Sequence, residues 1–360
     1  MSDLVNQYGS RKLIEGTNLQ NRIDNNVVPL ADVPLVKGWH YSIQEFKDAW
    51  KKGELVTGIV ETSNVCNLMC EYCFRDEIKQ SKKERLANEL NLEERLGLID
   101  QLSELNVKSL YISGAGEPTI DPLFKEQISY MVSKDIHPFV FTNGLHLSDD
   151  LISFLYDSGA SVMLKLNSFD EVVQDGLAQR NGYTKKRNET LQKLIQAGFN
   201  KREEGKPYAT RLAIDSIVCQ QNKDEVLDIF TYCRDNNIMP EIKTFIPAGR
   251  TKDRNDMEIS FDEFEKLSKR ARKIDKEKYG INYDRTFPFF GGLSCVNCSP
   301  ASIYTNIEGN IYECVAQEIP LGNIKGITIK EAMNKLKDKV HNPGFGCPAK
   351  IKYYKESKQI

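Results

Sequence analysis

The sequence has 360 residues, of which 40% are hydrophobic, and its formal net charge is −2. This length allows one large domain with appendages, or two domains. Both signs of charge are interspersed, so no strongly basic face is predicted and nucleic acid is not an expected partner. The N-terminal stretch lacks the apolar segment of a secretory signal, and no apolar run approaches the ~18 residues of a membrane span. We therefore expect a cytoplasmic protein with no membrane partner.

Residues 1–285 consist of a polar segment followed by a regular alternation of predicted strands and helices. Residues 1–55 are polar, with one short helix expected within 42–52, and we treat them as an N-terminal extension. Six β-rich runs follow, and apolar residues at helical spacing separate them. The runs occupy residues 56–62, 108–114, 137–144, 161–168, 210–218 and 240–247. Such alternation predicts parallel βαβ units, and six of them predict an α/β fold, a partial TIM-like (β/α)6 barrel, over residues 56–285.

Beyond residue 285 the pattern is different. Residues 287–298 are typical of a loop, and residues 303–314 predict a hairpin that turns at Glu308-Gly309-Asn310. A helix is expected over 329–340. We therefore expect a small C-terminal domain over residues 286–360.

The chain has nine cysteines. Because the cytoplasm keeps thiols reduced, we do not expect them to form disulfides. Cys219 and Cys233 stand alone, as buried small hydrophobic residues often do. The other seven form two groups: Cys66, Cys70 and Cys73, then Cys295, Cys298, Cys314 and Cys347. Grouped cysteines in a reduced chain indicate metal or iron–sulfur ligation.

The first cysteine group has C-x3-C-x2-C spacing and directly follows the first predicted strand. Three thiolates on one tight loop can bind three corners of a cubane cluster, which leaves the fourth iron open to a small molecule. A zinc loop or an unrelated cysteine cluster is the alternative, but zinc sites usually show paired C-x2-C knuckles.

With this motif the sequence resembles the radical S-adenosylmethionine (SAM) superfamily, in which an aromatic residue such as Tyr72 commonly precedes the third cysteine. The resemblance implies a [4Fe–4S] cluster on Cys66, Cys70 and Cys73, with SAM bound to the open iron. It also implies a one-electron reductant such as flavodoxin or ferredoxin, and a 5′-deoxyadenosyl radical that abstracts a hydrogen atom from the substrate.

Further cofactor contacts are expected where the next strands end. Gly114, Gly116 and Glu117 resemble the family's glycine–glycine–glutamate element, which holds the SAM amine, although Ala115 stands between the glycines. The resemblance also implies SAM contacts where the third and fourth strands end, at Asn143, Lys165, Asn167 and Ser168. Two alternatives stay open: Asn143-Gly144 can be a simple turn, and Lys165 can face solvent.

The fifth strand and the residue after it offer three candidates for a role in the reaction. Alternation places Arg211 and Asp215 on one face, where they serve either the reaction or an internal ion pair. Cys219, after the same strand, is either a hydrogen-atom donor, as in an epimerase, or a buried structural cysteine.

The second cysteine group resembles the auxiliary-cluster extensions called SPASM and Twitch domains. The resemblance implies one auxiliary [4Fe–4S] cluster on Cys295, Cys298, Cys314 and Cys347; zinc or no metal are the alternatives. Cys347 is remote, and without it the cluster would have an open iron.

These features favour an enzyme that acts on a small molecule such as a sugar, aminocyclitol or nucleoside, by dehydrogenation or epimerisation. The first alternative is a peptide maturase, although such relatives often carry a longer N-terminal peptide-binding domain. A nucleotide cyclase like that of molybdenum cofactor synthesis is a further alternative, but the chain lacks that enzyme's C-terminal Gly-Gly.

Overall fold

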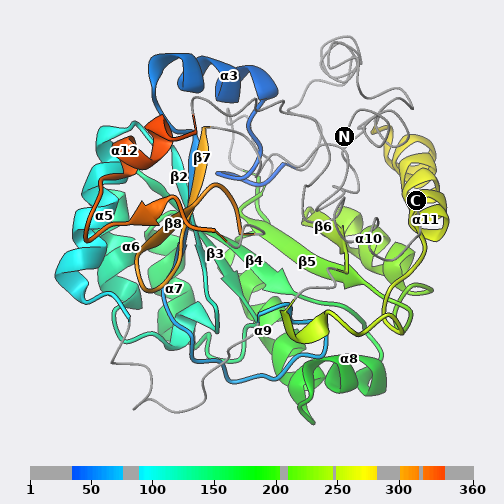
Figure 1. Cartoon of the computed structure of the whole chain (residues 1–360). Coiled ribbons are helices and arrows are strands. Elements are labelled where there is room, and N and C mark those ends of the chain that lie inside the picture. Colours follow the sequence, from blue (N-terminus) through cyan, green and yellow to red (C-terminus); the bar gives the residue numbers. More distant parts are fainter. Residues whose placement is uncertain are drawn as a thin grey trace.

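The computed structural model describes residues 35–75, 89–202, 210–245, 249–281, 301–315 and 319–336. A nine-stranded sheet with the order β6-β5-β4-β3-β2-β1-β7-β8-β9 forms its centre (Figure 1). The strands are β1 (Thr57–Glu61), β2 (Ser109–Ser113), β3 (His137–Thr142), β4 (Ser161–Lys165), β5 (Leu212–Val218), β6 (Met239–Thr244), β7 (Ser302–Thr305), β8 (Asn310–Tyr312) and β9 (Gly322–Asn323).

The six predicted β-rich runs are the strands β1 to β6, and each is parallel to its neighbour. Helices connect them and cover the outside of the sheet (Figure 1). This is the expected α/β partial barrel. The helices are α3 (Ile43–Lys52), α5 (Leu92–Glu104), α6 (Phe124–Ser133), α7 (Asp149–Asp157), α8 (Glu171–Ala178), α9 (Tyr183–Ala197), α10 (Val226–Asp235), α11 (Phe261–Ile274) and α12 (Ile329–Asn334).

Local sequence signals explain where several helices begin. In α3, the Ser42 side chain accepts the Glu45 backbone N–H, and the Glu45 carboxylate accepts the Ser42 N–H. The same reciprocal capping box opens α5, α11 and α12. Gly53 ends α3 in the left-handed region at φ 74°.

The alternation along each strand divides the core into two parts. One set of strand residues, such as Leu110 and Val140, packs against the helices in the largest hydrophobic cluster. The other set, such as Ile59, Tyr111 and Phe139, points into the barrel and forms a second cluster. The inner face therefore carries the side chains that surround any ligand bound within the barrel.

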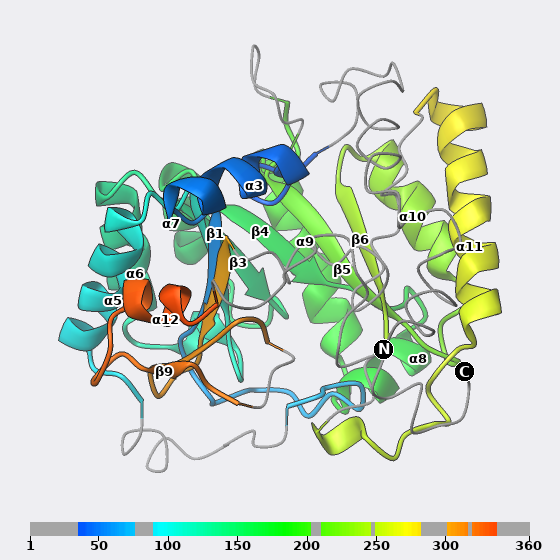
Figure 2. The same ribbon diagram turned by 45° about the horizontal axis from the view of Figure 1, so that its top comes forward.

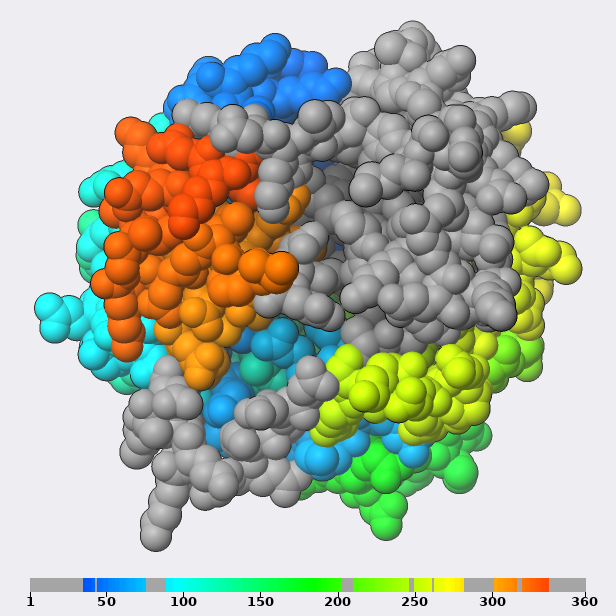
Figure 3. Space-filling model, in the orientation of Figure 1, coloured from blue at the N-terminus to red at the C-terminus, as the bar shows by residue number. Residues whose placement is uncertain are grey.

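The C-terminal hairpin forms with the predicted turn and continues the barrel's sheet. β7 pairs in parallel with β1, and β8 returns antiparallel to β7. Gly309 lies in the turn at φ 86°, where a Cβ would come within 2.8 Å of Ile324. Figure 3 shows these C-terminal strands and α12, in orange and red, beside α3 in blue. The expected loop at 287–298 and the end of the expected helix over 329–340 lie outside the described residues.

Part of the N-terminal extension closes the floor of the barrel. Val36 forms a parallel bridge with Thr210, and the carbonyl oxygens of Lys37 and Gly38 accept hydrogen bonds from the first residues of β4 and β2. Gly38 has φ 80°, and a Cβ there would lie 2.1 Å from the His137 ring. The helix α3 follows and lies across this end of the barrel (Figure 2). Within the described ranges, no helix is long and apolar enough to cross a membrane.

Candidate active site

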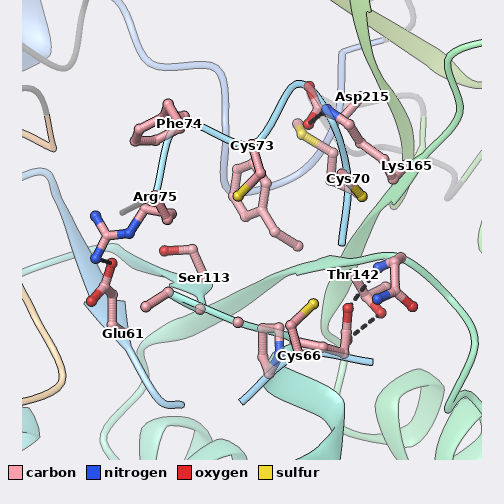
Figure 4. Close-up of a pocket in the computed structure, with 18 of the residues that line it drawn as sticks. Glu61, Cys66, Cys70, Cys73, Phe74, Arg75, Ser113, Thr142, Lys165 and Asp215 are labelled. Carbon is pink, nitrogen blue, oxygen red and sulfur yellow. Dashed lines mark hydrogen bonds and ion pairs between the residues drawn. The ribbon is translucent and has the colours of Figure 1, made fainter. Parts of the chain in front are cut away.

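A cavity of about 290 Å³ lies inside the barrel and receives side chains from β1 to β6. Figure 4 shows Cys66, Cys70 and Cys73 around it, with Lys165 and Asp215 on one side and the Glu61–Arg75 pair on the other. The cavity reaches down to the indole of Trp39, which belongs to the segment that closes the barrel floor. The carboxyl ends of barrel strands are where enzymes of this architecture build their active sites.

The three cysteines lie on the loop after β1, and polar contacts from distant elements hold this loop. Arg250 donates to the carbonyl oxygen of Cys70 at 2.8 Å, and Arg180 donates to that of Asn67 at 2.8 Å. The Asn143 side-chain amide donates to the Asn67 side chain at 2.7 Å. The loop is therefore attached to the segments that follow β3, α8 and β6.

Burial favours the protonated form of two of these thiols, those of Cys66 and Cys70. Burial raises the pKa of Cys66 to about 12 and that of Cys70 to about 11. Thiolate ligation thus requires the positive charge of a bound metal or cluster. Among the described residues, no three His, Cys, Asp or Glu side chains are gathered closely enough to hold a metal ion. All three cysteines line the same cavity, and the cluster assignment depends on their spacing and on the family match.

The strand end at Gly114–Glu117 packs closely on the cysteine loop, and position 116 therefore requires glycine. The N–H of Gly116 donates to the Ser63 oxygen at 2.7 Å, and that of Glu117 donates to the Val65 oxygen at 2.9 Å. A Cβ on Gly116 would lie 2.0 Å from the Val65 oxygen. Backbone atoms cannot give way as a flexible side chain can, so a side chain there would displace the cysteine loop.

Glu117 lies buried against this loop and lines the cavity. Its carboxylate accepts hydrogen bonds from the Thr119 and Thr142 hydroxyls at 2.6 Å, and from the Asn143 N–H at 2.8 Å. Burial raises its pKa, while these hydrogen bonds act in the opposite direction. Gly114, Gly116, Glu117 and Asn143, which the sequence analysis named as SAM contacts, thus lie together on the cavity wall beside the cysteines.

A second polar group on the cavity wall joins three strands. Lys165 Nζ lies 2.9 Å from Asp215 Oδ2, and Lys243 Nζ lies 3.0 Å from Asp215 Oδ1. The Lys165 ammonium also lies 4.9 Å from the centre of the Tyr72 ring. Burial alone would raise the pKa of Asp215, but the two ammonium groups outweigh it and lower the pKa to about 2. The sequence analysis named Lys165, but it missed Lys243.

On the opposite wall, Glu61 at the end of β1 pairs with Arg75, whose guanidinium nitrogen lies 2.6 Å from the carboxylate. The same guanidinium donates to the hydroxyl of Tyr304 on β7 at 3.3 Å. Burial raises the pKa of Glu61 against the attraction of Arg75. This contact attaches the segment after Cys73 to the C-terminal strands, a link that sequence reasoning did not find.

Two predicted cofactor contacts lie outside the cavity lining. Asn167 is fully buried, and its side-chain oxygen accepts the Ile217 N–H at 2.8 Å. Ser168 is also fully buried and donates to Glu225 at 2.8 Å. Both follow β4 and join the ends of strands and helices. A direct SAM contact from either residue stays a prediction that this geometry does not support.

Two of the candidate catalytic residues, Arg211 and Cys219, also lie outside the cavity lining. Arg211 precedes β5, at the floor end of the barrel, and donates to the carbonyl oxygens of Tyr156 and Ala160. The proposed ion pair of Arg211 with Asp215 is replaced by the two lysine contacts of Asp215. Cys219 is fully buried beside Phe245 and Met257, and burial raises the pKa of its thiol to about 11. The cavity lining contains neither Arg211 nor Cys219.

Of the second cysteine group, the structure describes Cys314, which is buried just after β8. The next residue, Val315, lines the cavity, so the chain beside Cys314 reaches the site. Cys295, Cys298 and Cys347 lie outside the described residues.

Comparisons with known proteins agree with this architecture. A family model described as the radical SAM superfamily matches residues 60–205. The sporulation killing factor maturation protein SkfB of Bacillus subtilis is 24% identical over 312 residues, which cover 79% of this chain and 69% of SkfB. A probable GTP 3′,8-cyclase of Methanothermobacter marburgensis is 26% identical over 300 residues, 78% of this chain and 89% of that protein.

Among solved structures, Streptococcus suis SuiB bound to the precursor peptide SuiA is similar, with a TM-score of 0.63 at 14% identity. The match covers 91% of this chain and 79% of SuiB, and at this identity it shows the shared fold. The matched family region contains the end of β1, the cysteine loop, the glycine-rich strand end and the strands β2 to β4. The family match therefore assigns residues 60–205 of the chain to the radical SAM superfamily.

Proposed function

We propose that the chain is a radical SAM maturase that modifies a peptide. The observation that carries this proposal is the likeness to SkfB, a maturation protein by its name, across 79% of this chain. The sequence analysis favours a small-molecule substrate and keeps peptide maturation as its alternative, so the comparison reverses that preference. The fold shared with SuiB, solved with a precursor peptide, is consistent with the same role.

The cavity fits the cofactors of this superfamily. Cys66, Cys70 and Cys73 would ligate the [4Fe–4S] cluster, and the Gly114–Glu117 strand end would receive the SAM amine, with Glu117 as its acceptor. When bound, the cluster and SAM supply a 5′-deoxyadenosyl radical that abstracts a hydrogen atom. Apolar side chains such as Tyr111, Phe141 and Met163 line much of the wall and exclude water from the reactants.

An auxiliary [4Fe–4S] cluster on Cys295, Cys298, Cys314 and Cys347 is part of this proposal. Support comes from Cys314, because Val315 next to it lines the cavity. A cluster ligated there would lie near the substrate and could accept an electron from it. The external reductant for the first cluster would be a flavodoxin or a ferredoxin.

A small-molecule substrate is the second candidate. The likeness to the probable GTP 3′,8-cyclase favours it, because the match covers 89% of that protein. The two candidates differ in the size and chemistry of the molecule that loses a hydrogen atom.

Deuterium transfer distinguishes the two candidates even while the substrate itself is unidentified. Host cells are grown in deuterated medium, and their extract is separated into a peptide fraction and a fraction of free metabolites. Each fraction is incubated with the anaerobically reconstituted protein, SAM and reductant, and 5′-deoxyadenosine is analysed by mass spectrometry. We expect deuterium in 5′-deoxyadenosine with the peptide fraction only. Deuterium transfer from the metabolite fraction alone would show that the second candidate is correct.

A further inference from the structure

The loop that carries the three cysteines reaches the protein surface at one residue. Of residues 66–73, Met69 alone is exposed, and the exposed fraction of its surface is 38%. Its neighbours Leu68 and Cys70 line the cavity, whereas Met69 does not. An exposed side chain is therefore the direct chain neighbour of Cys70, which is a proposed ligand of the cluster.

Two arginines from different segments contact this part of the loop. Arg250, which follows β6, donates to the Cys70 carbonyl oxygen at 2.8 Å, and its guanidinium lies 3.9 Å from the Met69 sulfur. Arg180, which follows α8 and is exposed, donates to the Asn67 carbonyl oxygen at 2.8 Å. In Figure 3 the segment that contains Arg250 lies at the surface in yellow-green, beside atoms in the blue of the cysteine loop. Met69 thus lies between two loop positions that guanidinium groups contact.

The charges around Met69 are not balanced. Among the residues that the structure describes, no carboxylate forms an ion pair with Arg180 or Arg250. A third arginine, Arg254, lies 3.4 Å from Glu71 and 2.9 Å from Asp256. Three guanidinium groups therefore face two carboxylates. The segment of Arg250 and Arg254 has two further exposed charged residues of opposite sign, Lys252 and Asp253.

The composition of this surface is typical of a protein–protein interface. Methionine and arginine are enriched at such interfaces, and the flexible thioether adapts to the shape of a partner. A guanidinium group has five N–H donors, of which the loop contacts use one on Arg180 and two on Arg250. The remaining donors suit carboxylates of a partner protein.

The proposed cluster sets a further requirement, because it must receive one electron from outside the protein. Electron transfer weakens steeply with distance, so the donor must bind where a cluster ligand lies near the surface. We propose that the surface formed by Met69, Arg180 and Arg250 docks a small acidic electron-carrier protein. In this step one electron leaves the carrier and enters the cluster, and no bond forms or breaks. This inference rests on the cluster of the proposed function and is independent of the substrate class.

The test varies the charge at Met69 and leaves unaltered the two arginines, which also hold the loop. Binding of oxidised flavodoxin to the anaerobically reconstituted full chain is measured by calorimetry, and reduction of the cluster by flavodoxin hydroquinone is followed by stopped flow. At low salt, Met69→Glu should weaken binding and slow reduction by about tenfold, because a like charge repels the acidic carrier. Met69→Gln should resemble the parent, and Met69→Lys should bind at least as tightly. These differences should shrink at high salt.

Two controls separate docking from damage to the loop. Val132→Glu adds the same charge at a position that is 42% exposed near the end of α6, and it should leave flavodoxin binding unchanged. Photoreduced deazaflavin is a small reductant that needs no docking surface, and it should reduce the parent and the Met69 variants equally fast.

Equal flavodoxin affinity across the Met69 series would overturn the docking surface, as would an effect of Val132→Glu as large as that of Met69→Glu. If Met69→Glu also reacts slowly with deazaflavin, the calorimetric difference between Met69→Glu and Met69→Lys decides the question, because binding does not depend on electron transfer. A parent protein without a reducible cluster would contradict the proposed function, while the calorimetric series would still test the docking surface.

Discussion

Lys165 and Asp215 are paired neighbours on β4 and β5, and their charged groups meet 2.9 Å apart inside the barrel. Parallel pairing places the two residues side by side, and alternation turns both toward the cavity. Because Lys243 lies on the other side of Asp215, one carboxylate stabilises two buried ammonium groups. Removal of one member of such a group is strongly destabilising, since it leaves buried charge uncompensated.

Asp215→Asn should therefore lower the free energy of unfolding at pH 7 by ~3–5 kcal/mol. An unfolded aspartate titrates near ~3.9, and the folded one near about 2. The stabilisation from Asp215 is thus complete above about pH 4 and is lost as the pH falls toward 2. Urea unfolding of the cluster-free apoprotein, from which acid can release no cluster, should show the difference in unfolding free energy between parent and variant narrowing over this range. A gap that stays constant on acidification would contradict the ionised pairing.

Gly116→Ala should disrupt the cofactor site, because its Cβ would overlap the Val65 backbone oxygen at the base of the cysteine loop. Overpacking costs ~1–3 kcal/mol, so SAM affinity should fall by about tenfold or more. Equilibrium binding of SAM to the reconstituted protein measures this. Gly97→Ala is the matched control, because α5 offers open space at that position. It should keep SAM binding and raise stability by up to ~1 kcal/mol.

Glu117→Gln should weaken SAM binding, because the ammonium would lose a charged acceptor. The expected loss is ~1.5–3 kcal/mol, or about ten- to a hundredfold in affinity. Iron content should stay near that of the parent, since Glu117 is not a proposed ligand of the cluster. Glu54→Gln, which alters an exposed acceptor of Asn106, should bind SAM normally. Unchanged SAM affinity in Glu117→Gln would show that the amine binds elsewhere.

Replacement of Cys66, Cys70 and Cys73 together by alanine should abolish reductive cleavage of SAM to 5′-deoxyadenosine. Iron and sulfide analysis should still find about four of each, as one remaining cubane cluster implies. Adding Cys314→Ala should remove most of that iron, because the auxiliary cluster would lose a buried ligand.

Cys233→Ala is the control for this series, since Cys233 is buried among the hydrophobic residues between sheet and helices. It should cost some stability and leave SAM cleavage intact. Stoichiometric zinc instead of iron in the triple variant would identify the C-terminal site as structural.

Much of the barrel was predictable because its signals are local. Each parallel strand is a short β-rich run between helical segments, and a run such as residues 109–113 shows this within its own sequence. The cysteine spacing was likewise predictable from local sequence. So was the position of Gly114 and Gly116 directly after β2. The turn at Gly309 was also predictable, because it depends on one residue's conformational freedom.

The sequence by itself thus determined the six parallel strands of the barrel, and it placed the cysteine motif and Glu117 shortly after the first two of them. The tertiary structure alone decided which distant side chains complete the site. It brought Trp39 from the N-terminal extension and Lys243 from β6 into the cavity, and it placed Arg211 at the floor and Asn167 in a buried network. The physical reason is that a position on a strand predicts the face toward which a side chain points, but not the partner that satisfies its charge. That partner depends on burial and on elements far away in the chain.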